Sequence, residues 1–410
     1  MQSNTSYPKD KINILLLEGV HPTAVKMFKD AGYRNVEALK GALAEKELIA
    51  KIKQVHLLGI RSKTQLSAAV IQSAPKLIAA GAFCIGTNQI DMVQAIDKGV
   101  AIFNSPYSNT RSVAEMVIGH CLTLMRRIPE KNTYMHAGKW DKSADGCHEV
   151  RGKTLGILGY GHIGSQVSVL AESLGMQVLF HDVEPKLSLG NARKAASLDQ
   201  LLKQSDIVTL HVPGAASTRN LINAAAIRKM KRGAVLINLS RGDVMDSNAV
   251  AAALKSGYLA SLAVDVFEKE PQSNKDPFSS IFQGMPNVVL TPHIGGSTAE
   301  AQESIGADVA SKLISFLETG STTGSLSIPA LSLPVQHDAH RLLHIHKNVP
   351  GVLSDINGLL SSMKVNIVGQ YLKTNADIGY VVVDVDRRTS SKVLEALSKV
   401  RNTVRVRQLY

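Results

Sequence analysis

Residues 155–182, LGILGYGHIGSQVSVLAESLGMQVLFHD, constrain the fold of this chain more than any other stretch. An apolar run enters a turn with three spaced glycines, a helix-like stretch follows, and a second apolar run ends at Asp182. Gly159 permits a tight turn, Gly161 allows a phosphate group to approach the backbone, and Gly164 allows the helix to pack closely on its strand. The pattern is typical of a strand, a helix and a second strand in a parallel sheet.

The same stretch predicts a binding site for a dinucleotide. The N-terminus of the helix offers free N–H groups and partial positive charge to a pyrophosphate. Asp182 follows Gly164 by roughly 18 residues, where a carboxylate accepts hydrogen bonds from the ribose 2′- and 3′-hydroxyls. Because that carboxylate would repel a 2′-phosphate, we expect NAD rather than NADP. A glycine-rich turn without a ligand is the alternative reading of the glycines alone, but strand, helix, strand and acid arrive here in order.

Length and cysteine content limit the remaining possibilities. A chain of 410 residues is too long for one core and predicts two or three domains. No apolar stretch reaches the roughly 18–20 residues that cross a bilayer, and the first residues contain no apolar signal segment, so we expect a cytoplasmic protein with no membrane partner. Cys84, Cys121 and Cys147 are dispersed, which suits a reducing compartment. His344 and His346 have no third ligand nearby in the sequence, and we predict no metal site.

The net charge of +12 requires an explanation. Basic chains bind nucleic acid or attract small anions. Here Lys and Arg are dispersed, and the densest groups, at residues 229–232 and 387–388, are short. Aromatic residues make up 4% of the chain, with one Trp, so no stacking platform for single strands is present. We therefore expect a solvated basic surface that attracts a phosphorylated, doubly anionic substrate, and no nucleic-acid partner.

Strand-like and helix-like stretches alternate over most of the chain, which predicts parallel sheets covered on both faces. The expected strands of the first part are 11–17, 55–60, 76–80 and 100–103, with a helix at 23–31. A long helix at 113–125 is expected to cross into the nucleotide-binding part, where strands are expected at 207–211, 234–238, 262–266 and 288–290. A helix at 300–317 is expected to return the chain to the first part.

The C-terminal part reads as a separate unit. Residues 319–338 are rich in Ser, Thr, Gly and Pro and are expected to form a linker. Beyond them, roughly 70 residues show a βαββαβ pattern of the ferredoxin-like kind. Its expected strands are 341–346, 366–373, 379–386 and 403–408, and its expected helices are 352–362 and 390–399.

Arg241, Glu270 and His293 each follow a predicted strand of the nucleotide-binding part. Ligands of open parallel sheets bind beyond the carboxyl ends of the strands, so these three side chains are expected to converge. A guanidinium can hold a substrate carboxylate, and an imidazole can remove a hydroxyl proton. A carboxylate beside the imidazole fixes its tautomer and raises its pKa. The set predicts hydride transfer between NAD and a 2-hydroxy acid, although Arg241 alone could merely bind cofactor, Glu270 could be a surface acid and His293 a structural loop residue.

The segments INLSRGDVMD, AVDVFEKEP and LTPHIGG resemble the signatures of the D-isomer-specific 2-hydroxy-acid dehydrogenases. Further similar stretches, LLLEGVH, GIRSKT, FCIGTNQ, NSPYSNTRSVAEMVIG and HIHKNVPGVL, extend the resemblance over essentially the whole chain. It implies an α/β fold in which a Rossmann-type nucleotide domain, 108–296, is inserted into a flavodoxin-like substrate domain. The substrate domain is then 1–107 with 297–330, and residues 339–410 form a ferredoxin-like ACT domain, a module that commonly binds amino acids.

The resemblance also implies an activity, the NAD-dependent oxidation of 3-phospho-D-glycerate to 3-phosphooxypyruvate, which is the first step of phosphorylated serine biosynthesis. It further implies feedback inhibition by L-serine and a homo-oligomer, expected to be a tetramer. Two alternatives remain open: another D-2-hydroxy-acid dehydrogenase, acting for example on 2-hydroxyglutarate or glycerate, and an NAD-binding regulator without catalysis. The cationic Arg61 and Lys63 argue against the first, and the ACT tail argues against the second.

Site residues are implied by the same resemblance. The catalytic set is Arg241, Glu270 and His293. The cofactor contacts are Gly159, Gly161, His162, Ile163, Gly164, Asp182, Leu239, Ser240, Arg241, Asp265, His293, Gly295 and Gly296. The substrate contacts are Arg61, Lys63, Cys84, Ile85 and Gly86.

The resemblance also implies one departure from the family pattern, one subunit contact and one site shared between chains. Lys63 departs from the family pattern, which has arginine there, so the bidentate fork is lost while the charge is kept. Trp140 matches a position at a subunit contact. His346, Asn348 and Asn366 match positions that bind serine across a pair of ACT domains. Because Asn348 lies in the first turn of the tail and Asn366 opens its second strand, we expect both asparagines to face one edge.

Overall fold

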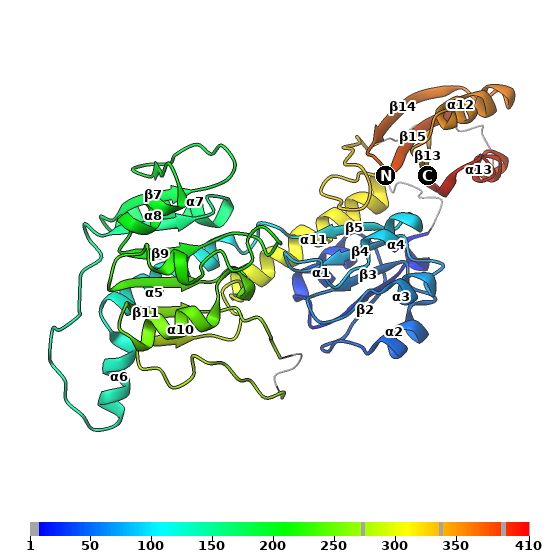
Figure 1. The fold of residues 1–410 in the computed structure, drawn as a ribbon. Helices are drawn as coiled ribbons and strands as arrows, with labels where there is room; N and C mark the ends of the chain where they lie inside the picture. The colour runs from blue at the N-terminus through cyan, green and yellow to red at the C-terminus, as the bar shows by residue number, and fades with distance from the viewer. Residues whose placement is uncertain (1–7, 272–274, 336–338, 387–390, 410) are drawn as a thin grey trace. The chain divides into compact units, whose positions relative to one another are not determined.

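The computed structural model describes residues 8–271, 275–335, 339–386 and 391–409 and divides into two compact units (Figure 1). Unit 1 contains residues 1–108 and 302–410, and unit 2 contains residues 109–301. Each unit is built on its own parallel sheet, and the C-terminal tail belongs to unit 1.

The sheet of unit 1 has five parallel strands in the order β2-β1-β3-β4-β5. They are β2 (Asn35–Ala38), β1 (Asn13–Leu16), β3 (Leu57–Ile60), β4 (Ala79–Ala82) and β5 (Ala101–Asn104), preceded by a short 3-10 turn, η1 (Lys9–Lys11). One face packs against α2 (Glu45–Ile52), α3 (Ala68–Gln72) and α4 (Met92–Asp97). The other face packs against α1 (Pro22–Asp30) and α11 (Ala299–Thr319). All four expected strands are present, although the one expected at 76–80 is β4 at 79–82, whereas β2, α2, α3 and α4 were not expected.

Unit 2 contains seven parallel strands in the order β12-β11-β10-β9-β6-β7-β8. They are β12 (Val288–Leu290), β11 (Leu259–Val264), β10 (Ala234–Asn238), β9 (Ile207–Leu210), β6 (Thr154–Leu158), β7 (Gln177–His181) and β8 (Arg193–Lys194). One face packs against α5 (Thr110–Met125) and α7 (His162–Ser173), and the other against α8 (Leu198–Gln204), α9 (Ala224–Ile227) and α10 (Ser247–Lys255). The strand order reverses between β6 and β9, the position where doubly wound sheets bind nucleotides.

The C-terminal tail has the predicted βαββαβ order. Its elements are β13 (Ala339–Lys347), α12 (Val352–Ser362), β14 (Ile367–Thr374), β15 (Ile378–Asp386), α13 (Ser391–Ser398) and β16 (Thr403–Leu409). The strands form an antiparallel sheet in the order β14-β15-β13-β16. Helices α12 and α13 cover one face of this sheet, and side chains of the other face join the core that contains α11.

The expectation of a linker at 319–338 is wrong for most of that stretch. The hydroxyl of Ser327 accepts a hydrogen bond from Ile102 N–H at 2.9 Å and donates one to Val100 O at 2.7 Å, so the segment packs beside β5. The hydroxyl of Thr322 accepts from Leu331 N–H and donates to Pro329 O. The Ser and Thr residues that resemble linker composition therefore satisfy buried backbone groups. Residues 336–338 lie outside the described residues.

The tail is joined to α11 by buried polar side chains. Arg341 is fully buried and forms a bidentate pair with Asp384 at 2.7 and 2.8 Å. The same guanidinium donates to Thr319 O at 2.9 Å, and Arg407 donates to Leu317 O at 2.8 Å. The hydroxyl of Tyr380 donates to Gly320 O at 2.6 Å. These donors satisfy carbonyls at the C-terminal end of the helix, which would otherwise lack partners.

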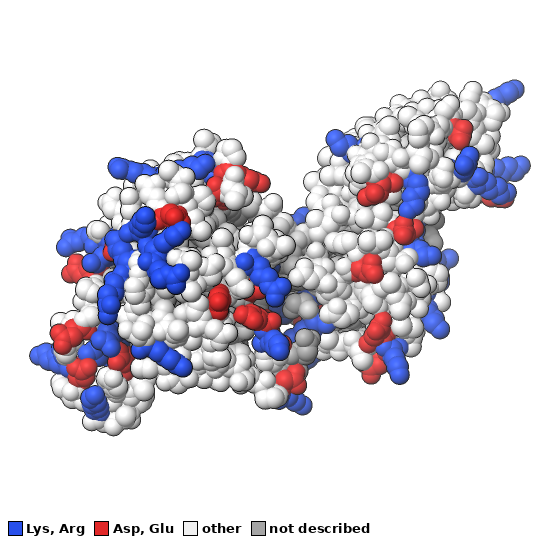
Figure 2. All heavy atoms as spheres, in the orientation of Figure 1, with Lys and Arg blue, Asp and Glu red and all other residues white. Residues whose placement is uncertain are grey.

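Lys and Arg side chains are spread over both units with acidic side chains among them, and one denser basic group lies on unit 2 (Figure 2). Among the helices that the structure describes, none combines the length and apolar character needed to span a membrane.

Candidate active site

The glycine turn of unit 2 lies between β6 and α7. Gly159 has a φ of +93°, and a Cβ there would lie 2.4 Å from His211 O. A Cβ at Gly164 would lie 2.2 Å from Gly159 O, so no larger residue fits at either position without backbone movement. A Cβ at Gly161 would meet nothing within 4 Å, so the turn is open in front of the N-terminus of α7. This open N-terminus suits a pyrophosphate.

Asp182 follows β7 and holds the glycine turn. Its Oδ2 accepts a hydrogen bond from Tyr160 N–H at 2.7 Å, and its Oδ1 accepts one from Glu184 N–H at 2.9 Å. A carboxylate has about four acceptor sites, so capacity remains for ribose hydroxyls. The sequence pointed only to the ribose, and the contact with the turn was missed.

Glu270 and His293 form a hydrogen-bonded pair in unit 2. Glu270 Oε2 lies 2.8 Å from His293 Nδ1, and Glu270 Oε1 accepts a hydrogen bond from Phe267 N–H at 3.1 Å. The hydrogen bond and negative charge of Glu270 raise the pKa of His293 above its usual value, although burial acts in the opposite direction. Burial favours a higher pKa for Glu270, but the hydrogen bond and charge of His293 outweigh it and lower that pKa. Since Nδ1 faces Glu270, Nε2 is the nitrogen available for proton exchange.

A buried carboxylate holds the loop that carries His293. His293 has a φ of +54°, a left-handed conformation that is uncommon for residues other than glycine. Asp265 is buried, and its Oδ1 accepts hydrogen bonds from Thr291 Oγ1 at 2.6 Å and Ile294 N–H at 2.9 Å. Its Oδ2 accepts from Gly295 N–H at 2.8 Å. Asp265 was expected at the cofactor, and its carboxylate holds the loop that carries His293.

Arg241 follows β10 in a turn held by Asn238. Asn238 Oδ1 accepts a hydrogen bond from Ser240 N–H at 3.1 Å, and its Nδ2 donates to Arg241 O at 2.9 Å. A short 3-10 turn, η2 (Gly242–Val244), follows, and a Cβ at Gly242 would lie 2.1 Å from Phe267 C. The loops after β10 and β11 are therefore in contact. The charge of Arg241 contributes to the lowered pKa of Glu270 and opposes the rise in the pKa of His293, so the three predicted side chains share one electrostatic environment.

The other expected cofactor residues lie at the same edge of the sheet. His162 and Ile163 begin α7, Leu239 and Ser240 are buried after β10, and Gly295 and Gly296 follow the His293 loop. A Cβ at Gly296 would lie 2.2 Å from Asn109 Nδ2, at the start of α5. Asn109, whose Oδ1 is buried without a hydrogen-bond partner among the described residues, was missed by the sequence reasoning. No group of three or more His, Cys, Asp or Glu in the described ranges could hold a metal ion.

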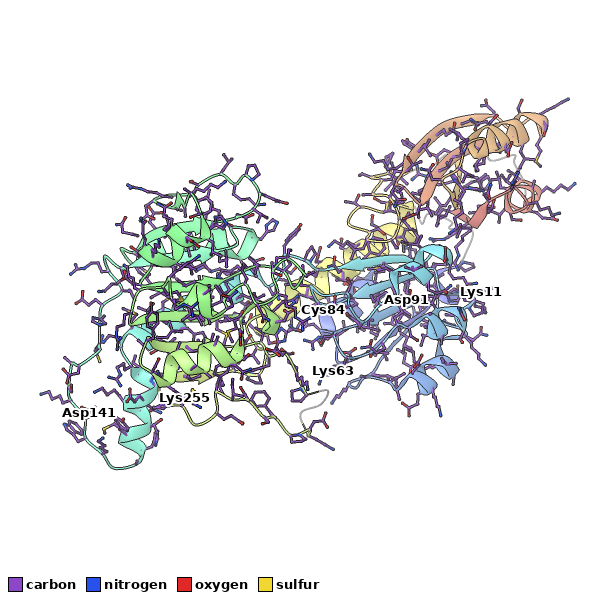
Figure 3. The ribbon with its side chains drawn as sticks, viewed as in Figure 1. Lys11, Lys63, Cys84, Asp91, Asp141 and Lys255 are labelled. Carbon is purple, nitrogen blue, oxygen red and sulfur yellow. The ribbon has the colours of Figure 1, made fainter. Side chains whose placement is uncertain are left out.

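The expected substrate residues lie at the carboxyl edge of the sheet in unit 1. Arg61 and Lys63 follow β3, and the 84–86 loop follows the neighbouring strand β4. Figure 3 labels Lys63 and Cys84 at this end of the strands and Lys11 at the other end. Arg61 is half-buried and Lys63 is exposed. The structure thus brings all five predicted substrate residues to one sheet edge of unit 1.

The expectation that Asn348 and Asn366 face one edge is wrong for a single chain. Asn348 follows β13, beside Asn375, to whose carbonyl its Nδ2 donates at 2.7 Å. Asn366 precedes β14, and its carbonyl accepts from Asp386 N–H. Both β13 and β14 pair antiparallel with β15, so they run in the same direction, and the end of one and the start of the other lie at opposite ends of the sheet. At about 3.3 Å per residue, β14 separates them by roughly 25 Å.

His346, the third residue expected at the serine site, is buried, and burial lowers the pKa of its imidazole.

Two family models match the chain. The D-isomer specific 2-hydroxyacid dehydrogenase, NAD binding domain model matches residues 118–295. The AHAS small subunit-like ACT domain model matches residues 342–405, within the tail. Unit 2 and the tail are thus matched by separate models.

Known proteins resemble the chain over its full length. It is 52% identical to D-3-phosphoglycerate dehydrogenase of Haemophilus influenzae and 51% identical to that of Escherichia coli K12. Both alignments cover 100% of this chain and 100% of the relative. Among solved structures, D-2-hydroxyisocaproate dehydrogenase is similar with a TM-score of 0.69 and 28% identity, covering 77% of this chain and 100% of that one.

Proposed function

The chain belongs to the D-isomer-specific 2-hydroxyacid dehydrogenases, and we propose that it catalyses the NAD-dependent oxidation of 3-phospho-D-glycerate to 3-phosphooxypyruvate. The observation that carries this proposal is the Glu270–His293 pair, which shares its environment with Arg241 in an NAD-binding domain. Full-length similarity to D-3-phosphoglycerate dehydrogenases supports the choice of substrate. Nucleotide binding is assigned to residues 108–296, substrate binding to 1–107 with 297–330, and regulation to 339–410.

Each of the three proposed catalytic side chains has a separate role in the oxidation of the hydroxyl group. NAD held at the glycine turn and Asp182 would supply the acceptor for the hydride of the hydroxyl-bearing carbon. Arg241 holds the substrate carboxylate through its planar fork of donors. Nε2 of His293 takes the hydroxyl proton, and Glu270 stabilises the resulting imidazolium through Nδ1. In the reverse direction the same imidazolium returns the proton to the keto oxygen.

Arg61 and Lys63 are assigned to the phosphate group of the substrate. Both are cationic and follow β3, whose carboxyl end lies beside the 84–86 loop that follows β4. Arg61 can bind phosphate oxygens in pairs, whereas Lys63 offers a point charge. An unphosphorylated hydroxy acid has no phosphate group for these two cations to bind.

NAD is preferred over NADP because of Asp182. Its carboxylate accepts hydrogen bonds from ribose hydroxyls and repels a 2′-phosphate. Its fixed position, held by Tyr160 N–H, keeps the negative charge beside the glycine turn.

L-Serine is proposed to inhibit the enzyme by binding between two tails. The exposed strand β14 is an edge of the tail sheet and bears exposed apolar side chains, Ile367, Val368 and Leu372. If two β14 strands pair antiparallel around a two-fold axis, the start of one strand lies beside the end of the other. Asn366 of each chain then comes close to Asn348 of the second copy, and the two amides can bind the ammonium and carboxylate groups of serine.

A tetramer is proposed because two separate surfaces are suited to two-fold contacts. One is the β14 edge. The other includes α6 (Ile128–His136) and the segment after it, where Ile128, Met135 and Trp140 are exposed. Two different two-fold interfaces on one chain produce a closed assembly of four when their axes cross at right angles.

A cytoplasmic location is proposed from Cys84, Cys121 and Cys147, all of which are free thiols.

One assay tests the proposed function. NADH formation is measured with 3-phospho-D-glycerate and with D-glycerate, each with and without L-serine, at matched NAD. We expect strong activity on the phosphorylated substrate, weak activity on D-glycerate, and inhibition by serine. Equal activity on both substrates would contradict the assignment of the phosphate.

A further inference from the structure

Glu18 lies at the carboxyl end of β1 and accepts hydrogen bonds from three backbone amides of one neighbouring loop. Its Oε1 accepts from Arg61 N–H at 3.1 Å and Thr64 N–H at 2.8 Å. Its Oε2 accepts from Lys63 N–H at 3.0 Å. The loop that carries both proposed phosphate-binding side chains is therefore anchored on a single carboxylate.

The backbone at Glu18 is unusual. Its φ is +62°, in the left-handed region that favours glycine, and Glu18 N–H donates to Gly41 O at 3.0 Å. An outlier of this kind persists only where the surroundings impose it, and such residues concentrate at functional sites. Here the conformation accompanies a side chain that reaches the 61–64 loop.

The three amides would otherwise form an anion site of their own. Successive backbone N–H groups that converge in a turn make a concavity that binds phosphate. In this loop the carboxylate of Glu18 already occupies that concavity. These three amides are therefore not available to a substrate phosphate, and the side chains of Arg61 and Lys63 are the cationic groups that the loop offers to it.

Gln89 also holds this loop through hydrogen bonds. This residue is buried, and its Nε2 donates to Arg61 O at 2.7 Å and to Gly86 O at 3.2 Å. Its own carbonyl accepts from Leu66 N–H at 2.8 Å. Both the N–H and the carbonyl of Arg61 thus have side-chain partners, and the 61–64 loop is tied to the 84–86 loop.

We propose that Glu18 is a positioning residue for phosphate recognition: it fills the amide concavity of the 61–64 loop and fixes the main chain from which Arg61 and Lys63 reach the substrate. This inference rests on the proposed function, because it assumes that the two cations bind phosphate. Glu18 itself does not touch the substrate. Its removal leaves both cations in place but releases the loop that aims them.

The test compares two substrates in three variants. Glu18→Gln keeps the shape of the side chain but replaces one acceptor oxygen by an NH2 group, which cannot accept from the backbone N–H that it faces. Glu18→Gly removes the side chain, and glycine readily adopts the left-handed backbone conformation at this position. Glu37→Gln is the matched control, since it removes a carboxylate from β2 of the same unit, where its partner is Lys51. Steady-state kcat and KM are measured with 3-phospho-D-glycerate and D-glycerate, and thermal unfolding is recorded for each variant.

We expect both Glu18 variants to raise KM for 3-phospho-D-glycerate by roughly fivefold or more, the effect of losing charge-assisted hydrogen bonds that position a binding loop. We expect kcat, the D-glycerate kinetics and the Glu37→Gln control to stay within about twofold of the unaltered protein, because these do not depend on phosphate binding. A merely structural role would lower activity on both substrates together, and that result would overturn the proposal. If Glu18→Gln does not fold, Glu18→Gly carries the same expectation.

A second measurement asks whether Glu18 acts through Arg61. In an Arg61→Ala background, Glu18→Gln should add less than about a twofold loss on the phosphorylated substrate, because coupled residues are non-additive. The same loss factor in both backgrounds would contradict the proposal. Failure of the proposed function is recognised separately: the unaltered protein would then show no preference for 3-phospho-D-glycerate, and the inference would fall with it. A clear preference that Glu18 variants leave unchanged would overturn the inference alone.

Discussion

Glu270 Oε2 lies 2.8 Å from Nδ1 of His293, and this contact raises the pKa of the imidazole. In the proposed mechanism oxidation needs neutral His293 as proton acceptor, so kcat/KM for the hydroxy acid should rise with pH through that raised pKa. Reduction of the keto acid needs the imidazolium and should fall over the same range. Glu270→Gln removes the charge, so both midpoints should move to lower pH. Profiles of kcat/KM in both directions check this, and unchanged midpoints in Glu270→Gln would contradict it.

Replacing His293 by Ala should remove proton transfer and weaken cofactor binding only slightly, because the imidazole is one of many expected cofactor contacts. We expect kcat to fall by roughly 10²–10⁴-fold, the usual contribution of a general acid–base group. The loop itself is held by Asp265 through the amides of Ile294 and Gly295, neither of which depends on the imidazole. NAD binding, measured by fluorescence titration, should therefore stay within about twofold of the unaltered protein. Near-normal turnover would contradict the assignment.

Asp182 predicts a particular pattern of cofactor use. Asp182→Asn keeps an acceptor for Tyr160 N–H but removes the negative charge, so it should weaken NAD binding less than Asp182→Ala. Both variants should improve kcat/KM for NADP relative to NAD, because repulsion of the 2′-phosphate is lost. Kinetics with both cofactors give the ratio. If the unaltered protein already uses both cofactors equally, the carboxylate does not select between them.

The sequence predicted that Arg241, Glu270 and His293 lie at one edge of the sheet, because the signals for that position are local. Each of Arg241, Glu270 and His293 follows an apolar strand, and parallel strands bring such positions to one edge. The residues that hold them were harder to find. Asn238, Asn109 and the second contact of Asp182 act through hydrogen bonds whose partners are set by loop geometry, and no spacing in the sequence encodes that geometry.

The segment before the tail shows that composition alone can give a wrong prediction. The Ser, Thr, Gly and Pro content of 319–338 predicted a linker, but Thr322 and Ser327 are buried because they satisfy backbone groups in the core of unit 1.

The positions of Asn348 and Asn366 in the tail depend on strand order, which the order of elements along the chain does not determine. A βαββαβ pattern places Asn348 and Asn366 in their elements, but only the pairing of β13 and β14 with β15 shows that they lie at opposite ends.

The buried Arg341–Asp384 pair predicts an asymmetry between single and double replacements. Arg341→Met leaves the carboxylate of Asp384 buried without its cation and also removes the donor to Thr319 O. Breaking a buried pair in this way costs about 3–5 kcal/mol, whereas replacing both charges by apolar residues costs less. Arg341→Met should therefore lower the thermal midpoint more than Arg341→Met with Asp384→Leu. The opposite order, measured by calorimetry, would contradict this account of the contact between the tail and α11.

Inhibition by serine can show whether the two asparagines of one serine site come from different chains. Asn348 and Asn366 lie too far apart in one chain to bind a single serine, so the proposed site combines Asn348 of one chain with Asn366 of another. Either Asn348→Ala or Asn366→Ala should abolish serine inhibition and leave uninhibited turnover unchanged, because the tail holds none of the proposed catalytic groups. The coupling that is lost is expected to be roughly 1–3 kcal/mol.

Mixing the two variants distinguishes a shared site from two independent ones. In a pair that contains one chain of each variant, one interface site loses both asparagines and the other keeps both. Serine binding, measured by calorimetry on co-expressed and doubly tagged pairs, should therefore return at about half the sites of the unaltered protein, as two-fold symmetry requires. If each chain bound serine by itself, no site in the mixed pair would be intact and binding would stay absent. Absence of serine binding in the unaltered protein would instead mean that the tail recognises another ligand or none.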